Sequence, residues 1–330
     1  MKRRIEKISA YVYTFLIVIF ICPGAYAFVL QGPHILELMA EKMGQAESLY
    51  ISQKVTFYNI SPAPEADESA AEAAAQKEYT GISEEDIGPS GDQPAAESTA
   101  PPAEYEPQMT AVEMEESLRY LFPEAFRSDI ITDDNQRIHV YINGEALTII
   151  GGASRAVSQT RFDFYKDLLL IRSRPELVDR LTQLNVDLSV RSLGRFEGRI
   201  YFVIGAQYPD ESSTQIWVDQ ENFRPLRWII SPGVGGFQTG TLEVRYLDWW
   251  QFNDNFWYPM RIEFYQDNVL VREMKVQRYE VDASISRELF NIEQLRSVYP
   301  QASPALSDSD EEEPVSDVQQ AIEEFGKMFE

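Results

Sequence analysis

Histidine and cysteine are scarce in this chain, which limits the chemistry that its side chains could perform. His34 and His139 are the only histidines, and Cys22 is the only cysteine. His34 stands at the start of a predicted helix and His139 on the polar side of a predicted strand, so both are expected to be ordinary surface residues. Because no pair of side chains has the spacing of metal ligands, neither a metal nor another cofactor is expected.

Other catalytic motifs are missing as well. The run Gly233-Val234-Gly235-Gly236 joins two predicted strands and does not open a helix, which indicates a flexible hairpin and not a phosphate-binding loop. Ser231 lacks the Gly-x-Ser-x-Gly setting of a nucleophile elbow. Acidic residues are so numerous that a carboxylate pair suggesting a glycosidase would be uninformative. The sequence therefore predicts a binding protein and not an enzyme.

The net charge of -24 is concentrated in two segments. Residues 61–116 carry 15 acidic residues and one lysine, and residues 303–330 carry nine acidic residues and one lysine. Both segments are poor in the apolar residues that would offset the entropy of ordering. No basic stripe that could neutralise phosphates is present, which argues against nucleic acid as a partner.

The first 27 residues have the features of a secretory signal peptide. Lys2, Arg3 and Arg4 precede an apolar run that ends near Cys22, and Ala25-Tyr26-Ala27 is typical of a cleavage site. We expect cleavage after Ala27; the alternative is a retained N-terminal anchor. Cleavage would remove the only cysteine and with it any disulfide.

The chain is organised around residues 214–281, which predict five antiparallel strands, each with one apolar and one polar face. Upstream, helical spacing from Gly32 to Leu49 predicts a helix, and Tyr50–Asn59 a strand. Further strands are expected at Phe126–Thr132, Arg137–Asn143, Ala146–Ile150, Val186–Leu193 and Arg199–Gln207, with a hairpin at Asn143-Gly144. Residues 161–185 fit two short helices broken near Pro175.

These elements predict an α+β fold. It consists of a strongly curved antiparallel sheet of about 10–11 strands, with helices covering the concave face. The predicted organisation is a signal peptide (1–27), a helix and first strand (28–60), a disordered acidic insertion (61–112), the rest of the domain (113–300) and an acidic tail (301–330). In that tail Val318, Ile322, Phe325 and Phe329 recur at helical spacing. The simplest interpretation is a helical end, and the alternative is a segment that docks into the protein's own groove or onto a partner.

A strongly curved sheet with few helices has more concave apolar area than short helices can fill. We therefore expect a cavity that could bury an acyl chain, at roughly 25 cal/mol per Å² of apolar surface. The residues predicted to line it are Ile138, Val140, Ile142, Leu168, Leu181, Phe202, Ile216, Leu226, Trp228, Val244, Tyr246, Met260, Ile262, Phe264 and Met274.

The order of these elements and several short stretches resemble the LolA/LolB-like lipoprotein-sorting superfamily. The matching stretches are Gln53-Lys54-Val55, Tyr120-Leu121-Phe122-Pro123-Glu124-Ala125-Phe126-Arg127, Ile216-Trp217-Val218-Asp219, Pro225-Leu226-Arg227 and Leu289-Phe290-Asn291-Ile292. The resemblance covers about residues 32–60 and 112–298. It implies an incomplete barrel, closed by helices, that holds lipid or lipoprotein acyl chains in the periplasm. Carriers of this type often have an arginine directly before the proline of the second strand, where it latches the helical lid, but here that residue is Phe122.

Two functions remain open. The first is a periplasmic, non-catalytic carrier of lipid or lipoprotein acyl chains. The second is a sensor or envelope-assembly module on the same fold, whose acidic segments recruit a protein partner. In either case the helix near the C-terminus could act as a plug.

Overall fold

The computed structural model describes residues 30–60, 109–132, 136–155, 159–234, 240–253 and 256–301. The predicted signal peptide, the core of the acidic insertion, Gly235-Gly236 of the predicted hairpin and nearly all of the acidic tail lie outside these ranges.

Thirteen antiparallel strands form one sheet in the order β6-β5-β4-β3-β2-β1-β13-β12-β11-β10-β9-β8-β7. The strands are β1 (Ser48–Ile60), β2 (Met109–Leu121), β3 (Ala125–Ile131), β4 (Gln136–Ile142), β5 (Glu145–Ile150), β6 (Ala153–Ser154), β7 (Arg191–Phe196), β8 (Arg199–Ile204), β9 (Gln215–Asp219), β10 (Pro225–Ile230), β11 (Leu242–Phe252), β12 (Phe256–Gln266) and β13 (Val269–Val281). The helices are α2 (Gly32–Lys42), η1 (Arg161–Lys166), α4 (Asp167–Leu170), α5 (Arg174–Gln183), η3 (Arg287–Phe290) and α6 (Ile292–Val298). The predicted fold class, a curved antiparallel sheet with helices, is confirmed, with more strands than expected.

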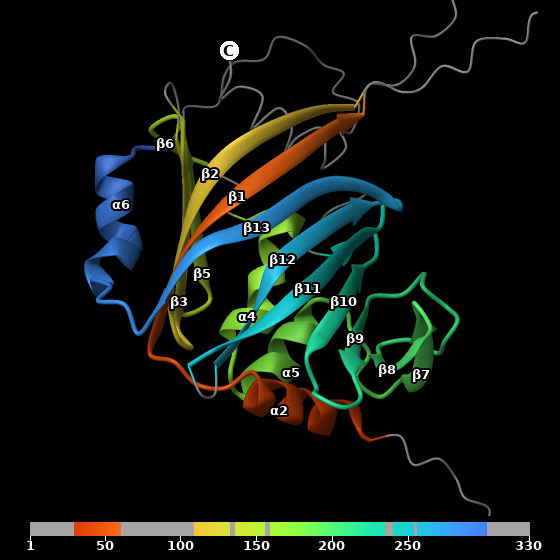
Figure 1. Ribbon diagram of the computed structural model, residues 1–330. Coiled ribbons are helices and arrows are strands. Elements are labelled where there is room, and N and C mark those ends of the chain that lie inside the picture. Colours follow the sequence, from red (N-terminus) through yellow and green to blue (C-terminus); the bar gives the residue numbers. More distant parts are fainter. Residues whose placement is uncertain are drawn as a thin grey trace, which may run out of the picture.

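The strand order shows why helices lie inside the curve. The chain runs outward from β1 to the edge strand β6, crosses to the opposite edge at β7, and returns strand by strand to β13 beside β1. The crossing segment contains η1, α4 and α5, and Figure 1 shows α4 and α5 within the curve of the sheet and α2 beside α5 at its lower end. We call η1, α4, α5 and α2 the lid.

The two strands that flank the acidic insertion are neighbours in the sheet. They pair from Ser48↔Leu121 to Ile60↔Met109. The strand β2 therefore begins at Met109 and includes residues 109–112, which had been expected to belong to the insertion.

The first helix is shorter than its apolar spacing predicts. Pro33 occupies its first turn, where the missing N–H costs nothing, and Ile35, Leu36 and Met39 are fully buried. It ends at Lys42 because Gly44 adopts a φ of 79°, which turns the chain toward β1. The prediction that this helix continues to Leu49 is wrong, since Leu49 is part of β1.

Two short helices do form in residues 161–185, but the break precedes Pro175. That proline lies in the first turn of α5, where the Ser173 hydroxyl caps the helix by accepting a hydrogen bond from the Glu176 amide at 3.4 Å. The strand expected from Val186 begins only at Arg191, because residues 186–190 form the connection from α5.

Helices cover both faces of the sheet, and not the concave face alone as predicted. The lid and the inner face of the sheet form the main hydrophobic cluster, whereas Phe290 and Ile292 of η3 and α6 pack with Ile138, Val140 and Leu147 on the other side. Figure 1 shows α6 outside the curve, beside β3 and β5. No helix in the described ranges is long and apolar enough to cross a membrane.

A third cluster fastens the edge hairpin β7–β8 to the outer face. Trp217 is 1% exposed and packs with Tyr201, Val203 and Phe196, and its indole N–H donates to Gln215 Oε1 at 3.0 Å. A Cβ at Gly194 would lie 2.5 Å from Trp217 Cη2, so this strand position admits no side chain without displacement of the indole.

We predict that Gly194→Ala lowers the free energy of unfolding by about 1–3 kcal/mol, because overpacking displaces a fixed aromatic ring. Urea titration followed by tryptophan fluorescence measures this change. The control is Arg195→Ala on the next, exposed residue, which should leave stability within about 0.5 kcal/mol. Equal effects of the two substitutions would contradict the close packing at Gly194.

Candidate functional site

Most of the predicted cavity residues do lie on the concave side of the sheet or in the lid that covers it. All of these belong to the main cluster or pack against it: Leu168, Leu181, Phe202, Ile216, Trp228, Val244, Tyr246, Met260, Ile262, Phe264 and Met274. The structure thus brings together the apolar faces of strands β8–β13 with the apolar sides of α4 and α5.

Four predicted cavity residues lie elsewhere. Ile138, Val140 and Ile142 face the outer side of β4, where η3 and α6 cover them. Leu226 is the extra residue of a β-bulge in β10 and packs against the cluster around Trp217. The alternation along β4 is as predicted, but its apolar side faces η3 and α6 and not the lid. The prediction of the side is wrong because both faces of this part of the sheet are covered.

The concave face is filled by the protein's own side chains. Phe264 is fully buried, with ring centroids 5.8 Å from Phe162 and 5.7 Å from Tyr165. The hydroxyl of Tyr246, also fully buried, donates to the backbone oxygen of Tyr165 at 2.9 Å. The hydrocarbon space expected inside the sheet is therefore occupied by residues of η1 and α4.

Part of the concave face is polar. Gln53 Nε2 donates to Glu116 Oε2 at 2.6 Å, and Arg272 Nη2 lies 3.5 Å from the same oxygen. Ser128 donates to the other carboxylate oxygen of Glu116. All four side chains are almost completely buried, so this patch of β1, β2, β3 and β13 is closed by its own hydrogen bonds and differs from the apolar surface of β8–β12.

A buried ion pair joins the lid to the sheet. Arg137 Nη2 of β4 lies 2.9 Å from Asp163 Oδ1 of η1, and both side chains are about 5% exposed or less. Burial opposes the charged form, but Arg137, then His139 and Lys166, outweigh it and hold the pKa of the Asp163 carboxyl well below its usual range. The same carboxylate caps η1 by accepting from the Thr160 amide at 2.9 Å.

His139 is not a surface residue, which corrects the prediction for β4. It is fully buried, and its Nδ1 lies 2.9 Å from Thr148 Oγ1 on β5. His34 is exposed as predicted and lies 3.1 Å from Glu37. Within the described part of the chain, no three His, Cys, Asp or Glu side chains are grouped to hold a metal ion.

A second charged residue of the lid lies over the rings of the sheet. The Arg172 guanidinium, between α4 and α5, is 4.8 Å from the ring centroid of Phe122 and 5.5 Å from that of Phe256. Its Nη1 and Nη2 are buried without a hydrogen-bond partner among the described residues, and burial lowers the pKa of Arg172 to about 10. Phe122 stands at the position where the family resemblance implies an arginine. In this structure an arginine of the segment between α4 and α5, Arg172, lies over the ring of Phe122 instead.

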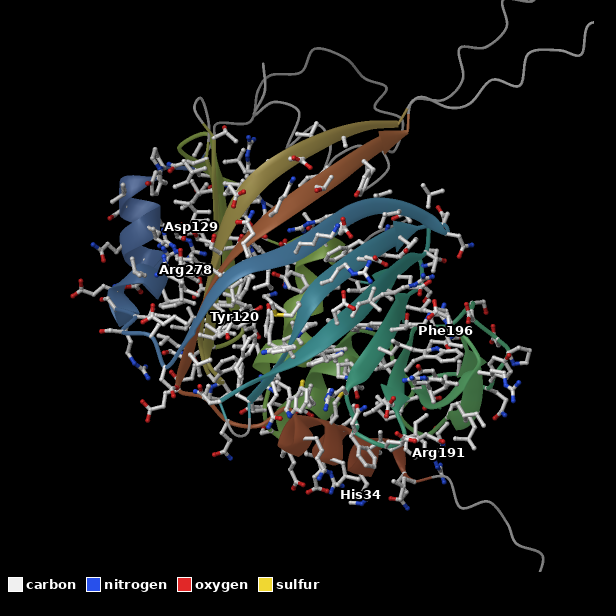
Figure 2. All side chains as sticks on the ribbon, in the orientation of Figure 1. His34, Tyr120, Asp129, Arg191, Phe196 and Arg278 are labelled. Atoms are coloured by element: carbon white, nitrogen blue, oxygen red, sulfur yellow. The ribbon has the colours of Figure 1, made fainter. Side chains whose placement is uncertain are left out.

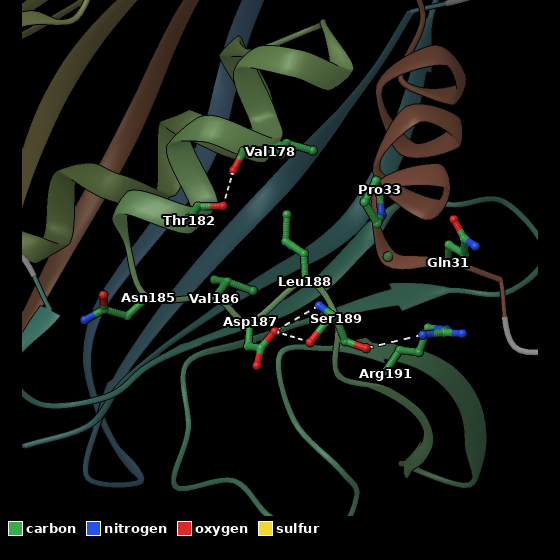
Figure 3. A pocket seen from close by; sticks show the side chains of 11 residues that line it. Gln31, Pro33, Val178, Thr182, Asn185, Val186, Asp187, Leu188, Ser189 and Arg191 are labelled. Atoms are coloured by element: carbon green, nitrogen blue, oxygen red, sulfur yellow. Dashed lines mark hydrogen bonds between the residues drawn. The ribbon is translucent and has the colours of Figure 1, made fainter.

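An open groove lies where α2, α5 and the connection to β7 meet, and Figure 3 shows it from close by. Its volume is about 800 Å³. Apolar residues of three segments form its walls, and polar residues form its rim; the lining is Gln31, Gly32, Pro33, Val178, Thr182, Asn185, Val186, Asp187, Leu188, Ser189 and Arg191. None of the predicted cavity residues lines this groove.

The groove borders directly on the main hydrophobic cluster. Val186 belongs to that cluster, and Val178 and Leu188 pack against it. A Cβ at Gly32 would lie 2.6 Å from the Leu188 carbonyl oxygen, so the glycine allows α2 to approach this connection closely.

Hydrogen bonds fix the polar rim. Asp187 Oδ1 accepts from the Ser189 hydroxyl at 2.6 Å and from its amide at 3.0 Å, and these bonds lower the pKa of Asp187. Arg191 Nη1 donates to the Ser189 carbonyl oxygen at 3.3 Å, as Figure 3 shows. The rim therefore carries an ordered acid and an ordered base beside apolar walls.

We predict that Asp163→Asn lowers the free energy of unfolding by about 3–5 kcal/mol near neutral pH, because it removes the carboxylate that pairs with the buried guanidinium of Arg137. The folded-state pKa of Asp163 is depressed, so its contribution is complete above the unfolded-state pKa of about 4 and is lost as the pH falls below it. Denaturant titrations from pH 7 to pH 3 should show the difference between wild type and variant shrinking with acidity. A difference independent of pH would contradict this assignment.

No protein-family model matches the sequence, and a search of curated proteins finds no match. Solved structures are similar in overall arrangement. An outer membrane lipoprotein-sorting protein domain from Vibrio parahaemolyticus has a TM-score of 0.45 at 10% identity, with 80% of this chain and 99% of that chain covered. A LolA superfamily protein from Nitrosomonas europaea has a TM-score of 0.43 at 10% identity, with coverage of 81% and 100%. A DUF1329 family protein from Desulfovibrio piger has a TM-score of 0.42 at 10% identity, with coverage of 80% and 97%.

The proteins found by this search thus include the superfamily that the sequence motifs resemble. Because each TM-score is below 0.5, no functional conclusion follows from these likenesses.

Proposed function

We propose that the protein is a non-catalytic carrier that binds an acyl chain of a lipid or lipoprotein in the groove between α2, α5 and the connection to β7. The observation that carries the proposal is the form of this groove: about 800 Å³, apolar at its walls, polar at its rim, and bordering on the main hydrophobic cluster. Sites for small ligands have this size and this distribution of polar groups.

The apolar walls supply the affinity. Val178 comes from α5, Pro33 from α2, and Leu188 from the connection between α5 and β7. An acyl segment that buries about 200 Å² of apolar surface would gain about 5 kcal/mol. This binding requires no catalytic residue and no cofactor.

The two helices that border the groove share the hydrophobic cluster and are joined at the surface by an exposed ion pair. Arg174 Nη1 of α5 lies 3.4 Å from Glu37 Oε2 of α2, and both side chains are more than one-third exposed. Such an exposed pair contributes little to stability. In our proposal the groove widens by separation of α2 from α5, while the buried ion pair at Asp163 keeps the rest of the lid in place.

The leader sequence agrees with this role, since it predicts export and hence a periplasmic location. Lipid and lipoprotein acyl chains that cross an aqueous compartment need an apolar binding site.

A second candidate function is an envelope sensor or assembly module in which the acidic segments recruit a protein partner. The observation that favours it is the filled concave face, where Trp228, Val244 and Phe264 are fully buried. Deletion of residues 61–108 distinguishes the two functions. A carrier should keep its affinity for acyl chains after the deletion, and a recruiting module should lose its partner.

We predict that residues 28–330 bind a fluorescent long-chain fatty acid and that Val178→Asp lowers the affinity at least tenfold, because it places a charge against the acyl chain. Fluorescence titration measures the affinity, and native mass spectrometry of the purified protein detects co-purifying lipid.

The matched control is Val269→Asp, which makes the same change at a position 40% exposed and outside the groove. Thr182→Trp serves as a second variant, because residue 182 is an exposed lining residue and a large ring there fills the groove without entering the core. Unchanged affinity in Val178→Asp and Thr182→Trp, with thermal unfolding like that of the wild type, would refute binding in this groove.

A further inference from the structure

The edge hairpin β7–β8 carries basic and apolar side chains on the face that turns toward the main hydrophobic cluster, and part of this face is exposed beyond the buried Phe202 and Ile204. Arg191, Leu193 and Arg195 alternate along β7 on the side of Ile204, Phe202 and Ile200, their partners on β8. Leu193 is 38% exposed and Ile200 is 47% exposed. We call Arg191, Leu193, Arg195 and Ile200 the basic strip.

The opposite face of the hairpin is anchored, so the basic strip has a fixed position. Phe196 lies on that face with its ring centroid 6.3 Å from that of Trp217, and the guanidinium of Arg227 lies 4.3 Å from the Phe196 ring centroid. Figure 2 shows Phe196 and Arg191 at opposite ends of β7. Exposure of Leu193 and Ile200 is therefore a feature of a rigid edge and not of a loop.

The hairpin carries more basic than acidic side chains. Residues 191–200 contain Arg191, Arg195 and Arg199 against a single acid, Glu197, in a chain whose net charge is -24. Arg195 is exposed and takes part in no salt bridge among the described residues. At physiological ionic strength charges are screened over about 8 Å, so a surface that approaches the hairpin meets chiefly the charge of the hairpin itself.

The basic strip continues into the groove. Arg191 belongs to the strip and also lines the groove, beside Ser189 and Leu188. A lipid whose headgroup lies on the strip can therefore reach the apolar walls with its acyl chain without crossing the lid.

We propose that the basic strip docks the protein on a membrane surface that contains anionic phospholipids, and that it holds the mouth of the groove at the lipid headgroups. Each arginine near such a surface adds attraction, and the two exposed apolar side chains enter the headgroup region. This inference rests on the proposed function, because the membrane is the surface from which the carrier would take the acyl chain or to which it would deliver it.

The experiment is a flotation assay with purified residues 28–330. The vesicles consist of phosphatidylcholine alone, or of equal parts phosphatidylcholine and phosphatidylglycerol. We expect binding to the anionic vesicles that decreases with added salt, and little binding to the neutral ones. Arg195→Glu should weaken binding at least about tenfold, and Leu193→Asp should weaken it at both low and high salt.

The matched control is Arg278→Glu, the same charge reversal at an exposed residue of β13, far from the hairpin in Figure 2. Both reversals change the net charge equally, so equal effects on vesicle binding would overturn the proposal. Absence of binding to anionic vesicles by the wild type would also overturn it.

Two further outcomes count against membrane docking. Arginines on an edge strand can serve to prevent pairing with other strands; if Arg195→Glu produces oligomers and leaves vesicle binding unchanged, the strip has that protective role. If an acidic peptide binds the strip and vesicles do not, the partner is a protein.

The fatty-acid titration without vesicles separates this inference from the proposed function. Arg195→Glu should bind the fluorescent fatty acid as the wild type does, since Arg195 does not line the groove. Loss of vesicle binding with retained fatty-acid binding supports docking by the strip. Loss of both, with thermal unfolding like that of the wild type, would overturn it, because Arg195 would then act on the groove and not on the membrane surface.

Discussion

The structure depends on one topological constraint: the chain must cross from one edge of an open sheet to the other over its concave face. The segment that crosses contains η1, α4 and α5, and the ion pair between Arg137 and Asp163 fastens its first part to β4. Because both charges are buried, this contact holds only while each has its partner. The interior of the curve is consequently occupied by the crossing segment and not by a guest molecule.

This constraint leaves the open groove, our proposed binding site, at the margin of the sheet and not at its centre. Where α5 ends, the chain leaves the lid and passes through residues 186–190 to the edge strand β7. There α2 approaches from the other side, and its close approach at Gly32 leaves an open groove beside the contact. The same margin carries the exposed hairpin, so an apolar groove and a basic edge are neighbours as a consequence of the strand order.

The sequence predicted the fold better than the site, for physical reasons. Alternation in strands such as Leu242–Phe252 reveals two faces, and the apolar one indeed faces the core. Alternation in Gln136–Ile142 is equally clear but does not say which face meets the lid, since Ile138 and Val140 are covered by α6. The groove has no local signal at all, because residues 31–33 and 178–191 line it together although they are far apart in the chain. Buried His139 and Asp163 were missed because polar residues are assigned to the surface unless a partner is known.

Polar contacts between lid and sheet gather at η1 and at the link between α4 and α5. Near η1 they include the ion pair between Asp163 and Arg137 and the hydrogen bond from the Tyr246 hydroxyl to the backbone of Tyr165. Between α4 and α5 the guanidinium of Arg172 lies over the rings of Phe122 and Phe256. Toward the end of α5 the buried residues are Leu181 and Leu184, whose contacts are apolar and non-directional. An acyl chain replaces apolar contacts of this kind with others, whereas it offers no substitute for the partner of a buried charge. In the proposed carrier, the end of α5 beside the groove is therefore the part of the lid that a lipid would displace at least cost, so that the ion pair would stay intact.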